Sequence, residues 1–138
     1  MALKTAQEYR ESLRDGRVVY LCGERVTDVL ANPILRTCIE TAAIDYEMTE
    51  MPAYRDLAVV TREDGNPISR YYHVPRSGDD LLKRHELMVE ATRLGSGAIP
   101  FTHDIASDAM NAVNITAALM GNEEYARRAE AYRRYLQD

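Results

Sequence analysis

The sequence predicts a mainly α-helical domain that carries two small β-hairpins. Apolar residues recur at helical spacing along most of the chain, and helix-capping patterns precede several of these stretches. Two tight turns, one Cys-Gly and one Asp-Gly, each separate a pair of short β-capable runs. With 138 residues, 46% of them hydrophobic and 28% charged, the chain has the size and balance of a single globular domain.

The distribution of charge argues against a nucleic-acid partner. The net charge is -5, and the densest group of arginines, in residues 127–134, is interleaved with glutamates. Nucleic-acid binding would require a concentrated basic face, so we interpret this segment as a solvated helix. No apolar run approaches the ~20 residues of a membrane span, and no secretory signal opens the chain. We therefore expect a cytoplasmic protein without a membrane partner.

The first third of the chain predicts helix, hairpin, helix. Thr5 and Glu8 form a capping-box pattern for a helix over residues 6–14. Residues 18–21 and 24–26 flank a turn and predict the first hairpin. Pro33 suits the first turn of a longer helix that ends before Met51. The apolar face expected for that helix consists of Leu35, Cys38, Ile39, Ala42 and Tyr46.

The middle of the chain predicts a second hairpin and another helix. Residues 57–61 and 68–74 have strand character, and we expect Pro67 to lie in the loop between them. Ser77 and Asp80 form a further capping-box pattern. The apolar side expected for the helix that follows consists of Leu81, Leu82, His85, Met88, Val89 and Thr92.

The last third predicts two helices after a break. Glycines and a proline interrupt the chain over residues 95–102, and a helix is expected from about Asp104 to Gly121, a natural C-cap. This helix is rich in alanine, so its backbone can approach a neighbouring element closely. Asn122 is the expected N-cap of the final helix, whose first turn is acidic.

No stand-alone catalytic signature is present. The Gly95-Ser-Gly97 segment follows no strand and lacks the Lys of a phosphate loop, so it is interpreted as a helix connection. Cys22 and Cys38 have no metal-like spacing and are expected to be reduced thiols. His73 is expected to end a strand, and His85, on an apolar helix face, is interpreted as a packed, hydrogen-bonded side chain.

The segment around His103 is the candidate site. Residues 101–111 place polar side chains at the start of a helix, directly after the break. In one interpretation, Thr102 or Asp104 is simply the N-cap of that helix. In the other, the segment faces a substrate, since a His beside an Asp at a helix start can position or exchange protons.

Three motifs carry a resemblance to a known family. The pattern Asp-Gly-Arg-x-Val-Tyr-x-x-Gly-Glu-x-Val-x-Asp-Val occupies residues 15–29, Tyr72-His-Val-Pro-Arg-Ser77 precedes an acidic helix start, and Asp108-Ala-Met-Asn-Ala112 follows the candidate segment. Together they resemble the N-terminal part of the flavin-dependent 4-hydroxyphenylacetate 3-hydroxylase family, which also contains 4-hydroxybutyryl-CoA dehydratase. The resemblance covers essentially the whole chain.

The resemblance implies a helical N-terminal domain over residues 1–138. In the family, a flavin-binding β-barrel and a helical C-terminal domain follow such a domain, and both are expected to be absent from this chain. The implied cofactor is reduced FAD, supplied by a separate flavin reductase and bound mainly by those other domains. The implied activity is hydroxylation of an aromatic ring.

The positions that define the two known branches of the family differ in this chain. The dehydratase branch holds an iron–sulfur cluster through two cysteines, whose matching positions here are Pro100 and Asp104, so no cluster and no other metal site are expected. The hydroxylase branch binds its phenolic substrate through an Arg and a Tyr, which match Ile105 and Ala109.

Our first interpretation of the chain is therefore the pocket-forming N-terminal domain of a monooxygenase. His103 and Asp104 are the candidates for proton handling or polar positioning, and the candidate substrate-binding residues are Phe101, Thr102, Ile105, Asp108 and Ala109. Expected partners are the flavin-binding domains or a flavoprotein subunit, the reductase, and further copies of the chain in a homo-oligomer. The alternatives are a cluster-less relative of the dehydratase and a non-catalytic helical subunit that docks on a flavoprotein.

Overall fold

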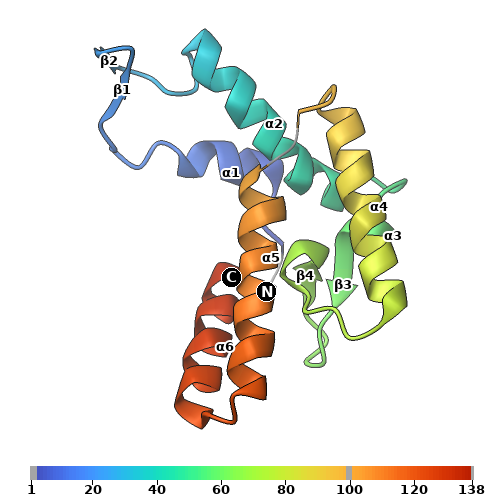
Figure 1. The fold of residues 1–138 in the computed structure, drawn as a ribbon. Helices are drawn as coiled ribbons and strands as arrows, with labels where there is room; N and C mark the ends of the chain where they lie inside the picture. The colour runs from blue at the N-terminus through green and yellow to red at the C-terminus, as the bar shows by residue number, and fades with distance from the viewer. Residues whose placement is uncertain (1–2, 99–100, 138) are drawn as a thin grey trace.

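The computed structural model describes residues 3–98 and 101–137. As predicted, the fold is mainly helical with two small antiparallel hairpins (Figure 1). The α-helices are α1 (Ala6–Ser12), α2 (Pro33–Glu50), α3 (Arg55–Ala58), α4 (Gly78–Leu94), α5 (Phe101–Leu119) and α6 (Glu123–Gln137). The strands are β1 (Val19–Leu21), β2 (Glu24–Val26), β3 (Val59–Thr61) and β4 (Pro67–Ser69), and a 3-10 helix, η1, spans Arg70–Tyr72.

The first hairpin forms where the sequence predicts it. Strands β1 and β2 pair with Leu21 opposite Glu24, so only Cys22 and Gly23 form the turn. Both turn residues have positive φ, 53° and 85°, which suits a two-residue hairpin. The hairpin projects away from the helices (Figure 1), and all residues of its two strands are exposed or only partly buried.

The N-caps predicted for α1 and α4 form, and Asn32 is the N-cap of α2. Thr5 and Glu8 form a reciprocal capping box at the start of α1, although that helix ends at Ser12 rather than at residue 14. The Asn32 side chain accepts hydrogen bonds from two backbone amides at the start of α2. The Ser77 hydroxyl accepts from the Asp80 amide at 3.1 Å and caps α4.

The second hairpin is shorter than predicted. Residues 55–58 form the helical turn α3, so the third strand begins only at Val59, and the segment expected to continue the fourth strand turns into η1 after Ser69. The prediction that Pro67 lies in the loop is wrong, since it is the first residue of β4 and pairs with Thr61. Proline is tolerated there because the position opens a strand of a two-stranded ladder.

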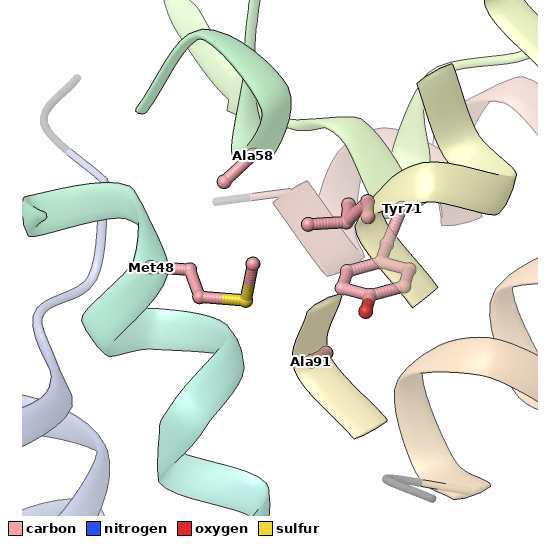
Figure 2. Packing of buried hydrophobic residues seen from close by; sticks show 5 residues of the cluster. Met48, Ala58, Tyr71 and Ala91 are labelled. Carbon is pink, nitrogen blue, oxygen red and sulfur yellow. The ribbon is translucent and has the colours of Figure 1, made fainter. Parts of the chain in front are cut away.

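The central core lies between α2, α3, η1 and α4. Its buried cluster consists of Met48, Ala58, Tyr71, Leu87 and Ala91. In Figure 2 the Met48 side chain extends from α2 toward the ring of Tyr71, with Ala58 and Ala91 beside them. A 3-10 turn therefore contributes the largest side chain of the core, which anchors the chain just before α4.

The buried face of α4 differs from the predicted one. Leu81, Leu82 and Val89, expected on the apolar side, are exposed, whereas Arg84 is buried together with Leu87 and Ala91. The predicted apolar side is wrong at these positions because it was chosen by apolar character alone, whereas Arg84 is buried by its contacts with the Tyr71 carbonyl and the Ser107 hydroxyl. A similar but smaller shift occurs in α2, where Cys38 is exposed and the buried set is Ile39, Ala43, Asp45, Met48 and Thr49.

Helices α5 and α6 form an antiparallel pair beside this core (Figure 1). The Tyr125 amide donates to the Asn122 side chain at 3.2 Å, which confirms the predicted cap of α6. The arginines of α6 pair mostly with Glu124 and Glu130 on the same helix, as expected of a solvated face. Within the described residues, no helix combines the length and the apolar character needed to cross a bilayer.

Candidate functional site

The candidate segment forms the first turns of α5. That helix begins at Phe101, three residues before the predicted start. Thr102 and Asp104 consequently lie inside the helix, and the interpretation that either residue is its N-cap is wrong. The side chains of Phe101, Thr102 and His103 lie outside the described part of the chain, as does Pro100.

Beyond these residues, α5 has one exposed and one buried face. Ile105, Asp108 and Ala109 are exposed and lie on the same side of the helix, since they are three and four positions apart. The Ile105 side chain is 59% exposed despite its apolar character. The structure thus brings three predicted substrate-binding residues onto one surface, with a single carboxylate between two apolar side chains.

The neighbouring face of α5 is polar and buried, and Asp108 lies at the boundary between the two faces. Asp104, Ser107 and Asn111 are each less than 5% exposed, although a buried helix face is usually apolar. The amide nitrogen of the Asn111 side chain donates to the carbonyls of Tyr71 and His73, both at 3.4 Å. These contacts attach α5 to the chain at and after η1.

Asp104 lies inside the domain beside the hydroxyl group of Tyr71. Burial raises the pKa of Tyr71, and the negative charges of Asp45 and Asp104, with hydrogen bonding between these carboxyls and the phenol, raise it further. Asp45 comes from α2 and is also buried. Because of this raised pKa, the Tyr71 hydroxyl remains protonated at pH values at which an exposed tyrosine loses its proton. The hydroxyl can therefore donate a hydrogen bond, and it links α2 to α5.

Asp108 is held by a buried arginine. Its Oδ1 atom accepts from Nε of Arg84 at 2.8 Å and lies 2.6 Å from Nη2 of the same guanidinium. The Arg84 side chain is only 5% exposed, whereas that of Asp108 is 56% exposed. The exposed Asp108 carboxylate is therefore held in place by a guanidinium inside the domain.

The histidines outside this segment are placed differently from the prediction. His73 follows η1 rather than ending a strand, and its Nε2 lies 3.5 Å from Oδ1 of Asp80. Partial burial lowers the pKa of His73, with the nearby Asp80 carboxylate acting in the opposite direction. His85, expected on a packed face, is exposed on α4.

The described residues offer little for a metal. Cys22 lies in the first hairpin turn and Cys38 on α2, and both are exposed. In the part of the chain that the structure describes, no three His, Cys, Asp or Glu side chains are grouped as metal ligands would be. The exposed face of α5 can instead pack against a flat apolar group while its carboxylate accepts a hydrogen bond.

Sequence reasoning missed the residues that support this face. Arg84 and Tyr71 were not singled out, nor were Asp45 and Ser107. One signal was available: Arg84, Leu87 and Ala91 have helical spacing, so an arginine lies in an otherwise apolar stripe. An arginine in such a stripe indicates a buried ion pair, because an unpaired buried charge is very costly.

A family profile and individual relatives match the same protein family. The profile described as 4-hydroxyphenylacetate 3-hydroxylase N terminal matches residues 5–138. The oxygenase component of 4-hydroxyphenylacetate 3-monooxygenase from Escherichia coli is 32% identical over 102 residues, which is 72% of this chain and 20% of that protein. A 4-hydroxybutyryl-CoA dehydratase/vinylacetyl-CoA-Delta-isomerase from Clostridium aminobutyricum is 32% identical over 144 aligned positions, covering 99% of this chain and 28% of that protein.

Solved structures show the same fold. The oxygenase component of 4-hydroxyphenylacetate 3-monooxygenase, in complex with FAD and 4-hydroxyphenylacetate, superposes with a TM-score of 0.82 at 25% identity over 97% of this chain and 28% of that one. An archaeal 4-hydroxybutyryl-CoA dehydratase from N. maritimus gives a TM-score of 0.86 at 23% identity, covering 99% of this chain and 27% of that one. The chain therefore spans between a fifth and under a third of these relatives.

Proposed function

Because the chain belongs to the 4-hydroxyphenylacetate 3-hydroxylase family, we propose that it is the N-terminal domain of an FAD-dependent aromatic monooxygenase. The observation that carries this proposal is the match over residues 5–138, together with several relatives that are oxygenase components acting on phenols. The proposed reaction inserts one oxygen atom of O₂ into the ring of a phenolic substrate and releases the other as water, with two electrons from reduced FAD. The flavin-binding barrel and the helical C-terminal domain would be supplied by further sequence or by a separate flavoprotein subunit.

In this proposal the first turns of α5 form one wall of the substrate pocket. Ile105 and Ala109 would contact the aromatic ring through their exposed apolar side chains, and Asp108 would present a fixed hydrogen-bond acceptor. Two features support the assignment: the face is apolar yet exposed, and buried polar contacts hold it in place. Phe101 and Thr102, at the start of the same helix, would extend this wall.

His103 and Asp104 would have different roles. His103 is the candidate for proton handling, since an imidazole is the side chain best suited to exchange a proton near neutral pH. Asp104 is buried beside Tyr71, so its proposed role is polar positioning of the helix start. His103→Ala is expected to lower turnover by about 10²–10⁴-fold if the imidazole transfers a proton.

The glycine-containing turn after α4 does not fit the phosphates of a flavin. The turn at Gly95 and Gly97 caps the C-terminal end of α4, and its amides already donate to Ala91 and Thr92. A helix C-terminus presents carbonyl groups, which repel phosphate. We therefore propose that most of the FAD contacts come from the other domains, and that FAD bound there in reduced form would supply the electrons for the reaction with O₂.

The outer side of α5 and α6 is the proposed docking surface for those domains. A shallow groove of about 550 Å³ lies between the two helices, and its lining residues include Ala112, Ala117 and Met120. Leu119 and Met120 are among the most exposed apolar side chains of the chain. Apolar patches of this kind favour association, so homo-oligomerisation through this surface is also expected, and a flavin reductase is the proposed transient partner.

The function is tested by assaying two reactions side by side with protein that includes the flavin-binding domains. We expect hydroxylation of phenols with reduced FAD and O₂, and no dehydration of 4-hydroxybutyryl-CoA. In the same assay, Asp104→Ala should lose stability, and its loss of activity per folded molecule should be smaller than that of His103→Ala, because Asp104 positions the helix and transfers no proton. Failure of every phenol to react would contradict the proposal.

The second candidate is a cluster-less relative of the dehydratase. It is retained because the dehydratase/isomerase of C. aminobutyricum aligns over 99% of this chain. In that relative's branch of the family, cysteines are expected where this chain has Pro100 and Asp104, and neither residue offers a thiolate. Conversion of 4-hydroxybutyryl-CoA without O₂ would favour this second function.

A further inference from the structure

The Arg84 guanidinium contacts three acceptors on α5 and one on η1. On α5 it donates to Asp108 Oδ1 and Ser107 Oγ, at 2.8 and 2.7 Å, and to the carbonyl of Asp104 at 3.4 Å. On the other side, Nη1 donates to the carbonyl of Tyr71 at 2.9 Å. The guanidinium carbon also lies 5.5 Å from the centre of the Tyr71 ring. One side chain of α4 therefore connects three elements.

The spacing of these acceptors fixes the orientation of α5. Asp104, Ser107 and Asp108 are three and four positions apart, so they form one patch on one side of the helix. A rotation of α5 by one residue would turn that patch by about 100°, and a shift along the axis by one turn would move it about 5.4 Å. Neither motion is compatible with the planar, forked arrangement of donors in a guanidinium.

Because Arg84 is buried, the loss of any of these hydrogen bonds would be costly. Arg84 is 4% exposed, and a charged group that is removed from water must keep its hydrogen bonds or incur a large free-energy penalty. The acceptors of Arg84 are thus required to stay where they are. Ile105 and Ala109 are carried by the same two turns of α5 as these acceptors.

We propose that Arg84 is a positioning residue that acts from inside the domain and sets the orientation of the exposed α5 face relative to η1 and α4. The face consists of Ile105, Asp108 and Ala109. The consequence for substrate rests on the proposed function, whereas the orientation itself does not. A small misplacement of a pocket wall lowers the rate of the chemical step more than it weakens binding.

The experiment replaces Arg84 by lysine, which keeps the charge but supplies its donors from a single nitrogen. Hydrogen exchange followed by mass spectrometry then compares the amides of residues 104–111 with those of α2. We expect Arg84→Lys to speed exchange in residues 104–111 about tenfold or more and to leave α2 unchanged, because only the former segment is held by the guanidinium. Ser107→Ala removes one acceptor and should have a smaller effect on the same segment.

Arg93→Lys is the matched control on the same helix. Its guanidinium is mostly exposed and pairs with Glu90 on α4, so no change in residues 104–111 is expected. Unchanged exchange in both Arg84→Lys and Ser107→Ala would overturn the proposal, as would a uniform increase throughout the domain. Ser107→Ala keeps the test decisive if Arg84→Lys does not fold.

Activity gives an independent measure in the protein with its flavin-binding domains. Arg84→Lys should lower kcat for phenol hydroxylation by about 10- to 100-fold while KM changes little, and less product should form per O₂ consumed. A kcat within about twofold of the parent would contradict a role in positioning the pocket. If the parent protein hydroxylates no phenol, the proposed function fails, and hydrogen exchange still decides the role of Arg84.

Discussion

Replacing Tyr71 by phenylalanine tests the buried link between α2 and α5. Tyr71 is 2% exposed, and its hydroxyl is the group that lies against both Asp45 and Asp104. A hydrogen bond to a charged group contributes roughly 1.5–3 kcal/mol, so Tyr71→Phe should lower the free energy of unfolding by about that amount at pH 7. The ring itself is retained, so packing against Met48 should be preserved.

The same substitution should also change how the free energy of unfolding depends on pH. Burial and the two carboxylates hold the pKa of Tyr71 far above its ordinary value of about 10, so the unfolded chain loses this proton first. The stability due to Tyr71 is complete below pH 10 and decreases as the pH rises further. Above pH 10 the parent should lose up to about 1.4 kcal/mol per pH unit more than Tyr71→Phe does, which corresponds to one proton.

Urea denaturation followed by circular dichroism, at pH 7 and at several values between pH 10 and 11, measures both effects. Tyr135→Phe is the control, since Tyr135 is 74% exposed and should affect neither. Equal stability of Tyr71→Phe and the parent at pH 7 would refute the link. Parallel decreases above pH 10 would refute the assignment of the titrating proton to Tyr71.

Three further predictions follow from the core, the α4 turn and the outer surface. Met48→Ala should destabilise the domain by about 2–5 kcal/mol in the same urea experiment, because Met48 is fully buried, and a loss below 1 kcal/mol would contradict the described core. The isolated chain should bind FAD weakly or not at all, and stoichiometric binding at low micromolar concentration in a fluorescence titration would overturn this expectation. Leu119→Lys should weaken self-association measured by sedimentation, because Leu119 is exposed on the α5–α6 surface. An association constant equal to that of the parent would show that the chain does not self-associate through this surface.

Local signals account for the parts of the fold that were predictable from sequence. The capping box of Thr5 and Glu8, the two-residue turn at Cys22 and Gly23, and the cap at Asn122 each depend on residues within four positions of one another. Their energetics are therefore nearly independent of the remaining fold. The number and order of the long helices follow from the same local signals.

The buried face of α4 and the end of the second hairpin were not predictable in this way. Arg84 is buried because acceptors from η1 and from α5, 13 to 24 residues away, surround its guanidinium. Residues 70–72 have strand character, yet Ser69 caps a 3-10 turn and Arg70 donates to the Leu57 carbonyl at 2.6 Å. Tertiary contacts overrode local preference at both places.

The position of the candidate segment in the fold was predicted in part. The sequence indicates the segment around His103 and the pair Ile105 and Ala109, and the structure places these two side chains on one exposed face with Asp108. The division of the same helix into an exposed face and a buried polar face could not be predicted. It depends on Arg84 and Tyr71, which lie 20 and 40 residues before the α5 residues Asp104 and Asn111 that they contact.

The most direct test of the proposed pocket wall compares parent protein and Ile105→Asp, each with its flavin-binding domains, in a phenol hydroxylation assay with isotopically labelled O₂. Ile105 is 59% exposed, so the substitution should change stability by no more than about 0.5 kcal/mol. We predict that the parent incorporates labelled oxygen into the phenolic product, and that Ile105→Asp forms at least about tenfold less product, because a charge replaces an apolar contact to the ring. Equal product formation by the two proteins would contradict the account.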